Sequence, residues 1–134
     1  MFLNQGHFLR RKRILVTGAS GFIGSHLIQK LDKIGAKVLA FYRSAPPAFM
    51  KSRSGEMRRL SFLNFKQLSH VVTKFRPEKI VHLAGFVNLE RSFQVAKTCV
   101  QVNIEGTLNL LESLKSVPLD VFVYVSTAEV YGSG

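Results

Sequence analysis

Features of extracellular and membrane proteins are scarce in this sequence. The chain has one cysteine, Cys99, so no disulfide can form within it. We expect Cys99 to be a small core residue, because Val95, Ala96, Val100 and Val102 around it are typical of a helix interior. No apolar run reaches the length of a membrane span, and residues 1–13 lack the apolar stretch of a secretory signal. We therefore expect a cytoplasmic location and no membrane partner.

Acidic residues are also scarce. Eight Asp and Glu stand against 19 Lys and Arg, which gives a formal net charge of +11. Such an excess suits nucleic acid, an anionic surface or a phosphorylated ligand. Much of it lies in residues 10–13 and 43–59, on either side of the glycine-rich segment described below. A nucleic-acid-associated protein would need a basic face elsewhere, and the sequence shows none clearly, so a phosphorylated ligand is favoured.

The length and hydrophobic content predict one folded domain. The 134 residues are 46% hydrophobic, which is enough to bury a single core, and no linker interrupts them. A basic head precedes the first apolar run. We therefore divide the chain into an N-terminal extension, residues 1–12, and a domain, residues 13–134, and we expect no metal site.

Apolar runs of strand length alternate along the chain with segments of helical periodicity. The predicted strands are residues 13–18, 37–42, 60–63, 79–85 and 120–126, and the predicted helices are residues 21–35, 65–75 and about 92–115. In the first helix, Ile23, Leu27, Leu31 and Ile34 form the apolar series. Strands that alternate with helices pair in parallel through right-handed crossovers. We predict an α/β fold with an open, doubly wound, Rossmann-like sheet of five strands in the order 3-2-1-4-5.

The strongest chemical signal is T-G-A-S-G-F-I-G, residues 17–24, between the first strand and the first helix. Gly18 permits a sharp turn, Gly21 lets backbone approach a pyrophosphate, and Gly24 lets the helix pack closely on the sheet. Unpaired N–H groups at the helix N-terminus favour an anion there. The segment predicts a dinucleotide phosphate site made by Gly18, Ser20, Gly21, Phe22, Ile23 and Gly24.

Three later segments make the comparison with a known family specific. They are V-H-L-A-G at 81–85, N-I-E-G-T-L-N-L-L-E at 103–112 and V-S-T-A-E-V-Y-G at 125–132. With the G-x-x-G-x-x-G spacing, they resemble the extended short-chain dehydrogenase/reductases, a group of nucleotide-sugar epimerases, dehydratases and reductases. The resemblance implies an NAD(P) cofactor, a nucleotide-sugar-like substrate in the complete enzyme and a possible homodimer. It places Leu83, Ala84, Gly85 and Asn103 beside the cofactor.

The resemblance also implies roles near the end of the fifth strand. Thr127 matches the hydroxyl that hydrogen-bonds the substrate's reacting oxygen. Glu129 matches a site carboxylate of dehydrating or decarboxylating members, although Ala128 replaces the acid of their T-D-E segment. His82, inside an apolar strand, is expected to be packed and hydrogen-bonded rather than catalytic.

The family's catalytic Tyr-x-x-x-Lys pair occurs nowhere in the 134 residues. A tyrosine of this kind exchanges a proton with the substrate, and the lysine lowers its pKa. We therefore expect the chain to be an NAD(P)-binding domain truncated before that helix and the substrate lobe, and catalytically incomplete by itself. A non-catalytic dinucleotide-binding or subunit-pairing module stays open as the alternative.

The end of the second strand bears on the choice between NAD and NADP. The residue that contacts the ribose lies about 20 positions beyond the glycine segment, and 43 − 24 = 19 identifies Arg43. Tyr42 stands where an acid would hold the 2′-hydroxyl of NAD, so we predict a preference for NADP. At the place of the family's adenine-binding Asp the chain has Ser61.

Overall fold

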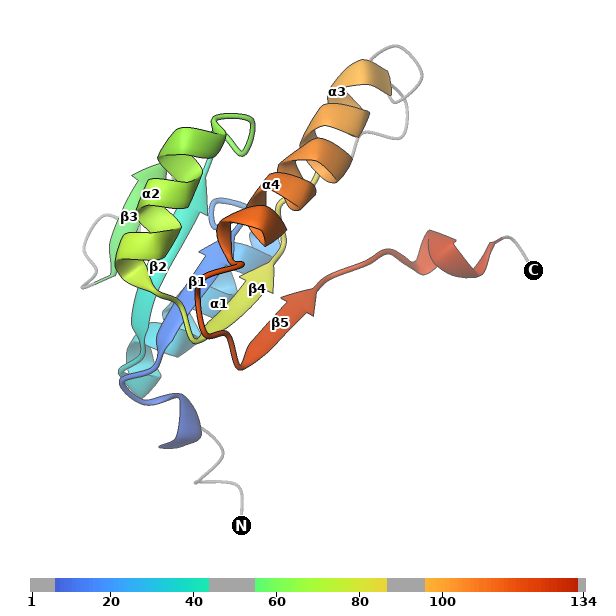
Figure 1. Cartoon of the computed structure of the whole chain (residues 1–134). Helices are drawn as coiled ribbons and strands as arrows, with labels where there is room; N and C mark the ends of the chain where they lie inside the picture. The colour runs from blue at the N-terminus through green and yellow to red at the C-terminus, as the bar shows by residue number, and fades with distance from the viewer. Residues whose placement is uncertain (1–6, 44–54, 87–95, 133–134) are drawn as a thin grey trace.

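The fold is a twisted sheet of five parallel strands, shown in a computed structural model that describes residues 7–43, 55–86 and 96–132 (Figure 1). The strands are β1 (Arg13–Thr17), β2 (Lys37–Tyr42), β3 (Glu56–Arg59), β4 (Lys79–His82) and β5 (Val121–Tyr124). Their order in the sheet is β3-β2-β1-β4-β5, which confirms the predicted topology. Because the order reverses at β1, the crevice between the carboxyl ends of β1 and β4 is the expected place for a ligand.

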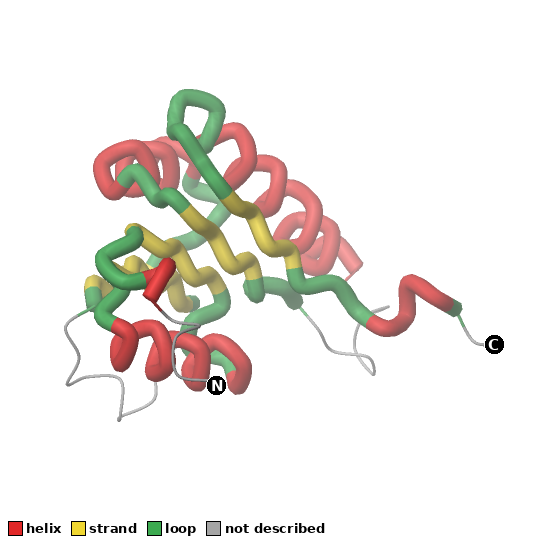
Figure 2. The backbone as a smooth tube through the Cα atoms, turned by 90° about the horizontal axis from the view of Figure 1, so that it is seen from below, coloured by secondary structure: helices red, strands yellow, loops and turns green. Residues whose placement is uncertain are grey.

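Helices cover both faces of the sheet (Figure 2). One face carries α1 (Phe22–Ile34), and the other carries α2 (Phe65–Phe75) together with α4 (Gly106–Ser113). A short helix, α3 (Ala96–Val100), and one turn of π-helix, η3 (Gln101–Glu105), lead directly into α4. Short 3-10 turns, η1 (His7–Leu9) and η4 (Ala128–Tyr131), stand near the two ends.

Two apolar clusters hold these layers together. On the α2 and α4 side, Leu68 and Leu110 pack against Leu15, Leu39 and Ile80 of the sheet. On the α1 side, the cluster consists of Ile14, Val16, Ala19, Ile28, Leu31, Val38 and Ala40. Successive residues of a strand point to opposite faces, so the near-continuous apolar runs of β1 and β2 are what a sheet covered on both faces requires.

Three details of the sequence prediction were wrong. The third strand is residues 56–59 rather than 60–63, because β3 is an edge strand with largely exposed polar residues and has no apolar signature. Ile23 was included in the buried face of α1, but its side chain is 59% exposed and Ile28 takes its place in the core. Cys99 is half-buried rather than a core residue.

The basic head docks at the opposite end of the sheet from the glycine segment. Lys12 Nζ donates to Glu78 Oε1 at 2.7 Å, and the backbone N–H of Arg13 donates to Glu78 Oε2 at 3.0 Å. These contacts lower the pKa of Glu78 to about 2. Within the described part of the chain, no helix has the length and apolarity needed to cross a membrane.

Candidate functional site

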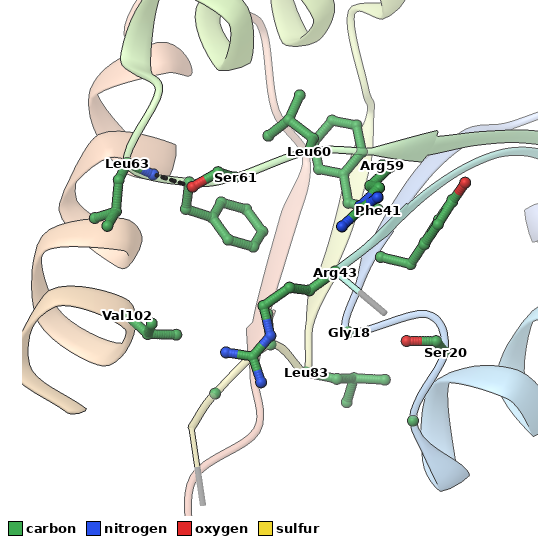
Figure 3. Close-up of a pocket in the computed structure, with 15 residues that line it drawn as sticks. Gly18, Ser20, Phe41, Arg43, Arg59, Leu60, Ser61, Leu63, Leu83 and Val102 are labelled. Atoms are coloured by element: carbon green, nitrogen blue, oxygen red, sulfur yellow. Dashed lines mark hydrogen bonds between the residues drawn. The ribbon is translucent and has the colours of Figure 1, made fainter. Parts of the chain in front are cut away.

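The carboxyl ends of the strands open onto a cavity of about 630 Å³. Figure 3 shows residues from the glycine turn, from β2, from the segment after β3 and from the segment after β4 around it. Val102 of the π turn closes the side next to α3. The lining residues are Gly18, Ser20, Gly21, Phe41, Tyr42, Arg43, Arg59, Leu60, Ser61, Phe62, Leu63, Leu83, Ala84, Gly85 and Val102.

Gly18 makes the turn out of β1 and lies directly against the segment after β4. Its φ of +67° is in the left-handed region, which costs a residue with a Cβ about 1 kcal/mol or more. A Cβ there would also stand 2.8 Å from the backbone N of Ala84 and from the carbonyl oxygen of Leu83. Glycine is therefore required at position 18 for both backbone conformation and space.

Gly21 and Gly24 have different constraints. Gly21 is the N-cap of α1 with an ordinary φ of −73°, and a Cβ there would meet only the Gly18 carbonyl oxygen, at 3.2 Å. At Gly24 a Cβ would overlap the Gly18 carbonyl oxygen and lie 2.9 Å from Ala19 Cα. The close packing of α1 on the turn thus depends on Gly24, whereas Gly21 presents bare backbone to the cavity.

The beginning of α1 suits an anion. No side chain caps the helix, and its first turn holds no acidic residue. The first N–H groups of a helix have no partner within the helix, and its dipole is positive at this end. An anion in the cavity beside Ser20 and Gly21 would satisfy both features.

Thr17, the last residue of β1, fixes the opposite wall of the cavity. Its hydroxyl oxygen accepts hydrogen bonds from the backbone N–H groups of Leu83 at 3.2 Å and Ala84 at 3.1 Å. The same hydroxyl lies 2.6 Å from His82 Nδ1. Thr17 therefore ties the end of β1 to the cavity-lining segment after β4.

His82 continues this network toward α4. Its Nε2 lies 3.0 Å from the hydroxyl of Thr107, which donates to the carbonyl oxygen of Asn103 at 2.8 Å. Since the Thr107 proton is used, Nε2 must donate to Thr107, and Nδ1 accepts the proton of Thr17. Burial lowers the pKa of His82 to about 4, so the ring is neutral near pH 7. The prediction of a packed, hydrogen-bonded histidine is confirmed.

Asn103 holds the next residue of the cavity wall. Its Oδ1 accepts from the backbone N–H of Phe86 at 2.6 Å, and its Nδ2 donates to the carbonyl oxygen of Phe86 at 3.1 Å. Both polar atoms of the Asn103 side chain are thus bonded to the backbone of Phe86, the residue that follows Gly85. The side chain predicted to lie beside the cofactor thus supports the loop that lines the cavity.

The side of the cavity at β2 and β3 is basic. Arg43 follows β2, and its guanidinium lies over the Phe86 ring at 5.7 Å from the centroid. Arg59 ends β3 and also lines the cavity, and none of the lining residues within the described part of the chain is acidic. Of the predicted cofactor residues, the cavity is lined by Gly18, Ser20, Gly21, Arg43, Leu83, Ala84 and Gly85, whereas Phe22, Ile23, Gly24 and Asn103 stand behind or beside it.

Sequence reasoning missed several lining residues. The sequence predicts Arg59 only as part of a basic stretch, Leu63 as part of the third strand and Val102 as part of a helix interior, so none of the three is assigned to the cavity. The apolar lining residues carry no signal that separates them from core residues. Arg59 could have been found only with the correct position of β3.

The predicted catalytic residues lie beyond β5. Thr127 is exposed and follows the carboxyl end of that strand, on the same edge of the sheet as the cavity, but it does not line the cavity. The side chain of Glu129 falls outside the described part of the structure. Among the described residues, no group of three or more His, Cys, Asp or Glu could hold a metal ion.

Comparison with protein families identifies the chain. Residues 14–134 match the sequence model of the NAD dependent epimerase/dehydratase family. The chain belongs to this family. Members are of the extended short-chain dehydrogenase/reductase type that the motifs predicted.

Curated relatives cover several reactions. The chain is 33% identical to dTDP-D-glucose 4,6-dehydratase of Dictyostelium discoideum over 92% of its length, and 35% identical to UDP-glucuronic acid decarboxylase 2 of Arabidopsis thaliana over 92%. It is 29% identical to mouse UDP-glucose 4-epimerase over 91% of its length. These matches span 30%, 28% and 39% of the respective relatives, so the chain corresponds to about a third of a family member.

Solved structures agree with the fold. UDP-glucose 4-epimerase of Thermotoga maritima, solved with UDP-glucose, superimposes with a TM-score of 0.83 at 30% identity, over 91% of this chain and 40% of that one. The epimerase Mth375 of Methanothermobacter thermautotrophicus gives 0.83 at 28% identity, over 92% and 37%. Family members with the same five-strand arrangement therefore continue well beyond the part matched here.

Proposed function

We propose that this chain binds the nicotinamide dinucleotide NAD(P) in the cavity at the carboxyl ends of β1, β2 and β4. It would be the cofactor-binding part of an epimerase, dehydratase or related oxidoreductase that acts on a nucleotide sugar. The observation that carries the proposal is the bare backbone of the Gly18 to Gly24 turn, which leads into the uncapped N-terminus of α1 beside the cavity. The names of the relatives support the substrate class, and MoeE5, 29% identical, was solved with UDP-glucose and NAD.

The residues present fit such a cofactor. A volume of about 630 Å³ lies within the roughly 300 to 1,000 Å³ of small-molecule sites. The pyrophosphate would lie on the N–H groups after Gly21, and a side chain at position 21 would displace it. The adenosine would lie between Arg43 and Ser61, and the nicotinamide would lie toward Leu83, Ala84 and Gly85.

Thr127 is proposed to act on the substrate. When bound, the cofactor would transiently accept a hydride from the substrate. The hydroxyl of Thr127, after β5, would hydrogen-bond the reacting oxygen of the substrate. The 134 residues provide no Tyr-x-x-x-Lys pair to move the proton. We therefore expect the chain by itself to bind the dinucleotide without turning over nucleotide sugars, and sustained turnover above a no-protein control would contradict this.

We further propose that NADP is preferred over NAD. Arg43 lines the cavity, and the lining residues that the structure describes offer no carboxylate for the 2′-hydroxyl of NAD. Arg43 contacts the Phe86 ring through its guanidinium, and within the described residues no hydrogen bond or ion pair uses its N–H groups, which can therefore donate to a phosphate. Charge-assisted bonds of this kind contribute about 1.5 to 3 kcal/mol, or about ten- to a hundredfold in affinity.

The test of dinucleotide binding is the substitution Gly21→Val. Its φ of −73° suits valine, so the domain should still fold, but the side chain would occupy the place of the phosphates. Gly55→Val is the matched control, because Gly55 begins the approach to β3 outside the cavity lining. We expect calorimetric titration with NADPH to show binding in the parent and in Gly55→Val and at least about a hundredfold loss in Gly21→Val. Unchanged affinity in Gly21→Val would refute the site.

A further inference from the structure

We propose that Arg59 is a second specificity-determining residue, which binds the 2′-phosphate of the cofactor together with Arg43. This inference rests on the proposed function of the cavity. The sequence points only to Arg43, after β2, whereas Arg59 is the last residue of β3. The strand register and the cavity lining bring Arg59 into the site.

The register of the two strands brings the arginines to one place. Tyr42, the last residue of β2, is paired with Arg59, the last residue of β3. Arg43 directly follows Tyr42, and neighbouring strands are about 4.8 Å apart. The backbones of Arg43 and Arg59 therefore lie close together at the carboxyl edge of the sheet. Both line the cavity, and Figure 3 shows the side chain of Arg43 extending toward Leu83 while Arg59 lies beside Phe41. Two guanidinium groups that line one cavity match a dianionic phosphate.

The charges around β3 separate Arg59 from its neighbour. Arg58 forms an ion pair with Glu56 on the same strand and does not line the cavity. Arg59 has no ion-pair partner within residues 7–43, 55–86 and 96–132. Successive residues of a strand point to opposite faces, so Glu56 and Arg58 project from the face opposite to Arg59, and their ion pair does not include it. The positive charge of Arg59 is therefore available to a ligand.

The two arginines would contribute differently. Arg43 is held over the ring of Phe86, across the cavity from β3, whereas Arg59 stands beside Tyr42. A phosphate between them would receive donors from two sides, which fixes its position better than either arginine alone. Bidentate donation from a planar guanidinium distinguishes a phosphate from a hydroxyl, because the hydroxyl offers fewer acceptor positions.

The experiment compares binding of NADPH and NADH, and of 2′,5′-ADP and ADP, by the 134-residue chain and its variants. Arg59→Ala tests the proposal, and Arg59→Lys tests whether charge without the planar fork suffices. Arg58→Ala is the matched control, since it removes one positive charge from the next position outside the cavity. We expect Arg59→Ala to lower the preference for NADPH over NADH by about ten- to a hundredfold, mainly by weakening NADPH. Arg59→Lys should retain part of the preference, and Arg58→Ala should retain nearly all of it.

The outcomes separate this inference from the function on which it rests. If the parent binds both dinucleotides and Arg59→Ala keeps the parent's preference, while Arg43→Ala loses it, Arg59 has no such role and the function stands. An equal loss in Arg58→Ala would show a general effect of charge and would also overturn the proposal. If the parent binds neither dinucleotide, the function of the cavity itself is wrong.

Discussion

Val16 and Val123 occupy the same row of the sheet in very different surroundings. Both are in register with Val81 of β4, Val16 from β1 and Val123 from β5. Val16 is 0% exposed, whereas Val123 is 43% exposed. The β1 side of the site is built on a strand buried on both faces, and the β5 side is largely uncovered by the described residues. The part of the site that is proposed to bind the cofactor is therefore built on the most buried strand, and Thr127 follows a strand that the described residues leave largely exposed.

The largest effect should come from breaking the packing of α1 on the β1 side. Gly24→Ala places a Cβ against the backbone of Gly18 and Ala19, which cannot move without shifting the turn. We expect a loss of more than about 3 kcal/mol in the free energy of unfolding, measured by urea denaturation. Gly21→Ala, with its single contact at 3.2 Å, should lose less than about 1 kcal/mol. Equal losses would mean that the helix can move away from the turn.

The two valines give a direct measure of the difference between the strands. Val16→Ala removes two methyl groups from a closed core and should cost about 2 to 3 kcal/mol in unfolding free energy. Val123→Ala at the same level of the sheet should cost less than about 1 kcal/mol, because water already reaches the side chain. Similar costs in the 134-residue chain would contradict this, since they would mean that β5 is covered in solution.

His82 joins the two sides, since it is bonded to Thr17 of β1 and its ring faces Tyr124 of β5 at 5.5 Å. Its pKa is lowered from 6.5 to about 4 in the folded protein, so the unfolded chain binds the extra proton between these values. Stability should therefore be full above pH 6.5 and fall as the pH drops toward 4, by about 2 kcal/mol between pH 7 and 5.

Urea denaturation at several pH values checks the prediction for His82. His82→Gln should lose most of the slope between pH 6.5 and 4.5. Below pH 4.5, protonation of Glu78 should add a second loss, because its pKa is lowered to about 2 in the folded state. A stability that stays constant from pH 7 to 5 would show that the buried ring takes up its proton without cost.

The smallest effect is expected at the junction of β4 and β5. Lys79 Nζ lies 3.5 Å from Asp120 Oδ2, and the carboxylate is more than half exposed. Exposed ion pairs of this kind contribute about 0 to 1 kcal/mol. Asp120→Asn should therefore change the unfolding free energy by less than about 1 kcal/mol, and less still in 0.5 M salt. A larger loss would indicate that β5 depends on this pair more than on its apolar contacts.

The sequence predicted most of the fold, because buried strands and amphipathic helices each have a recognisable spacing of apolar residues. Residues 37–42 and 65–75 were predicted with the bounds found for β2 and α2. The edge strand β3 was displaced by four positions, because exposure removes the periodicity on which the prediction depends.

The candidate site was only partly predictable. The glycine turn is local, so its spacing could be read directly. The bonds from Thr17 to His82 and to Ala84 join residues 65 and 67 positions apart, and no local pattern encodes them. Likewise, only the strand register shows that Arg59, rather than Arg58, lines the cavity.

The π turn before α4 sets the rotational phase of the helix that flanks the cavity. The N–H of Gly106 bonds to the carbonyl of Gln101, five residues back, so this turn holds one residue more than an α-helical turn would. Deleting Ile104 or Glu105 would restore regular winding and rotate the helical residues before the deletion by about 100° around the axis relative to α4. Val102 would then leave the cavity, and the amide of Asn103 would leave Phe86. The extra residue thus acts as a spacer that keeps Val102 at the cavity and Asn103 on the backbone of Phe86. We expect this segment to tolerate substitutions better than the deletion of a residue.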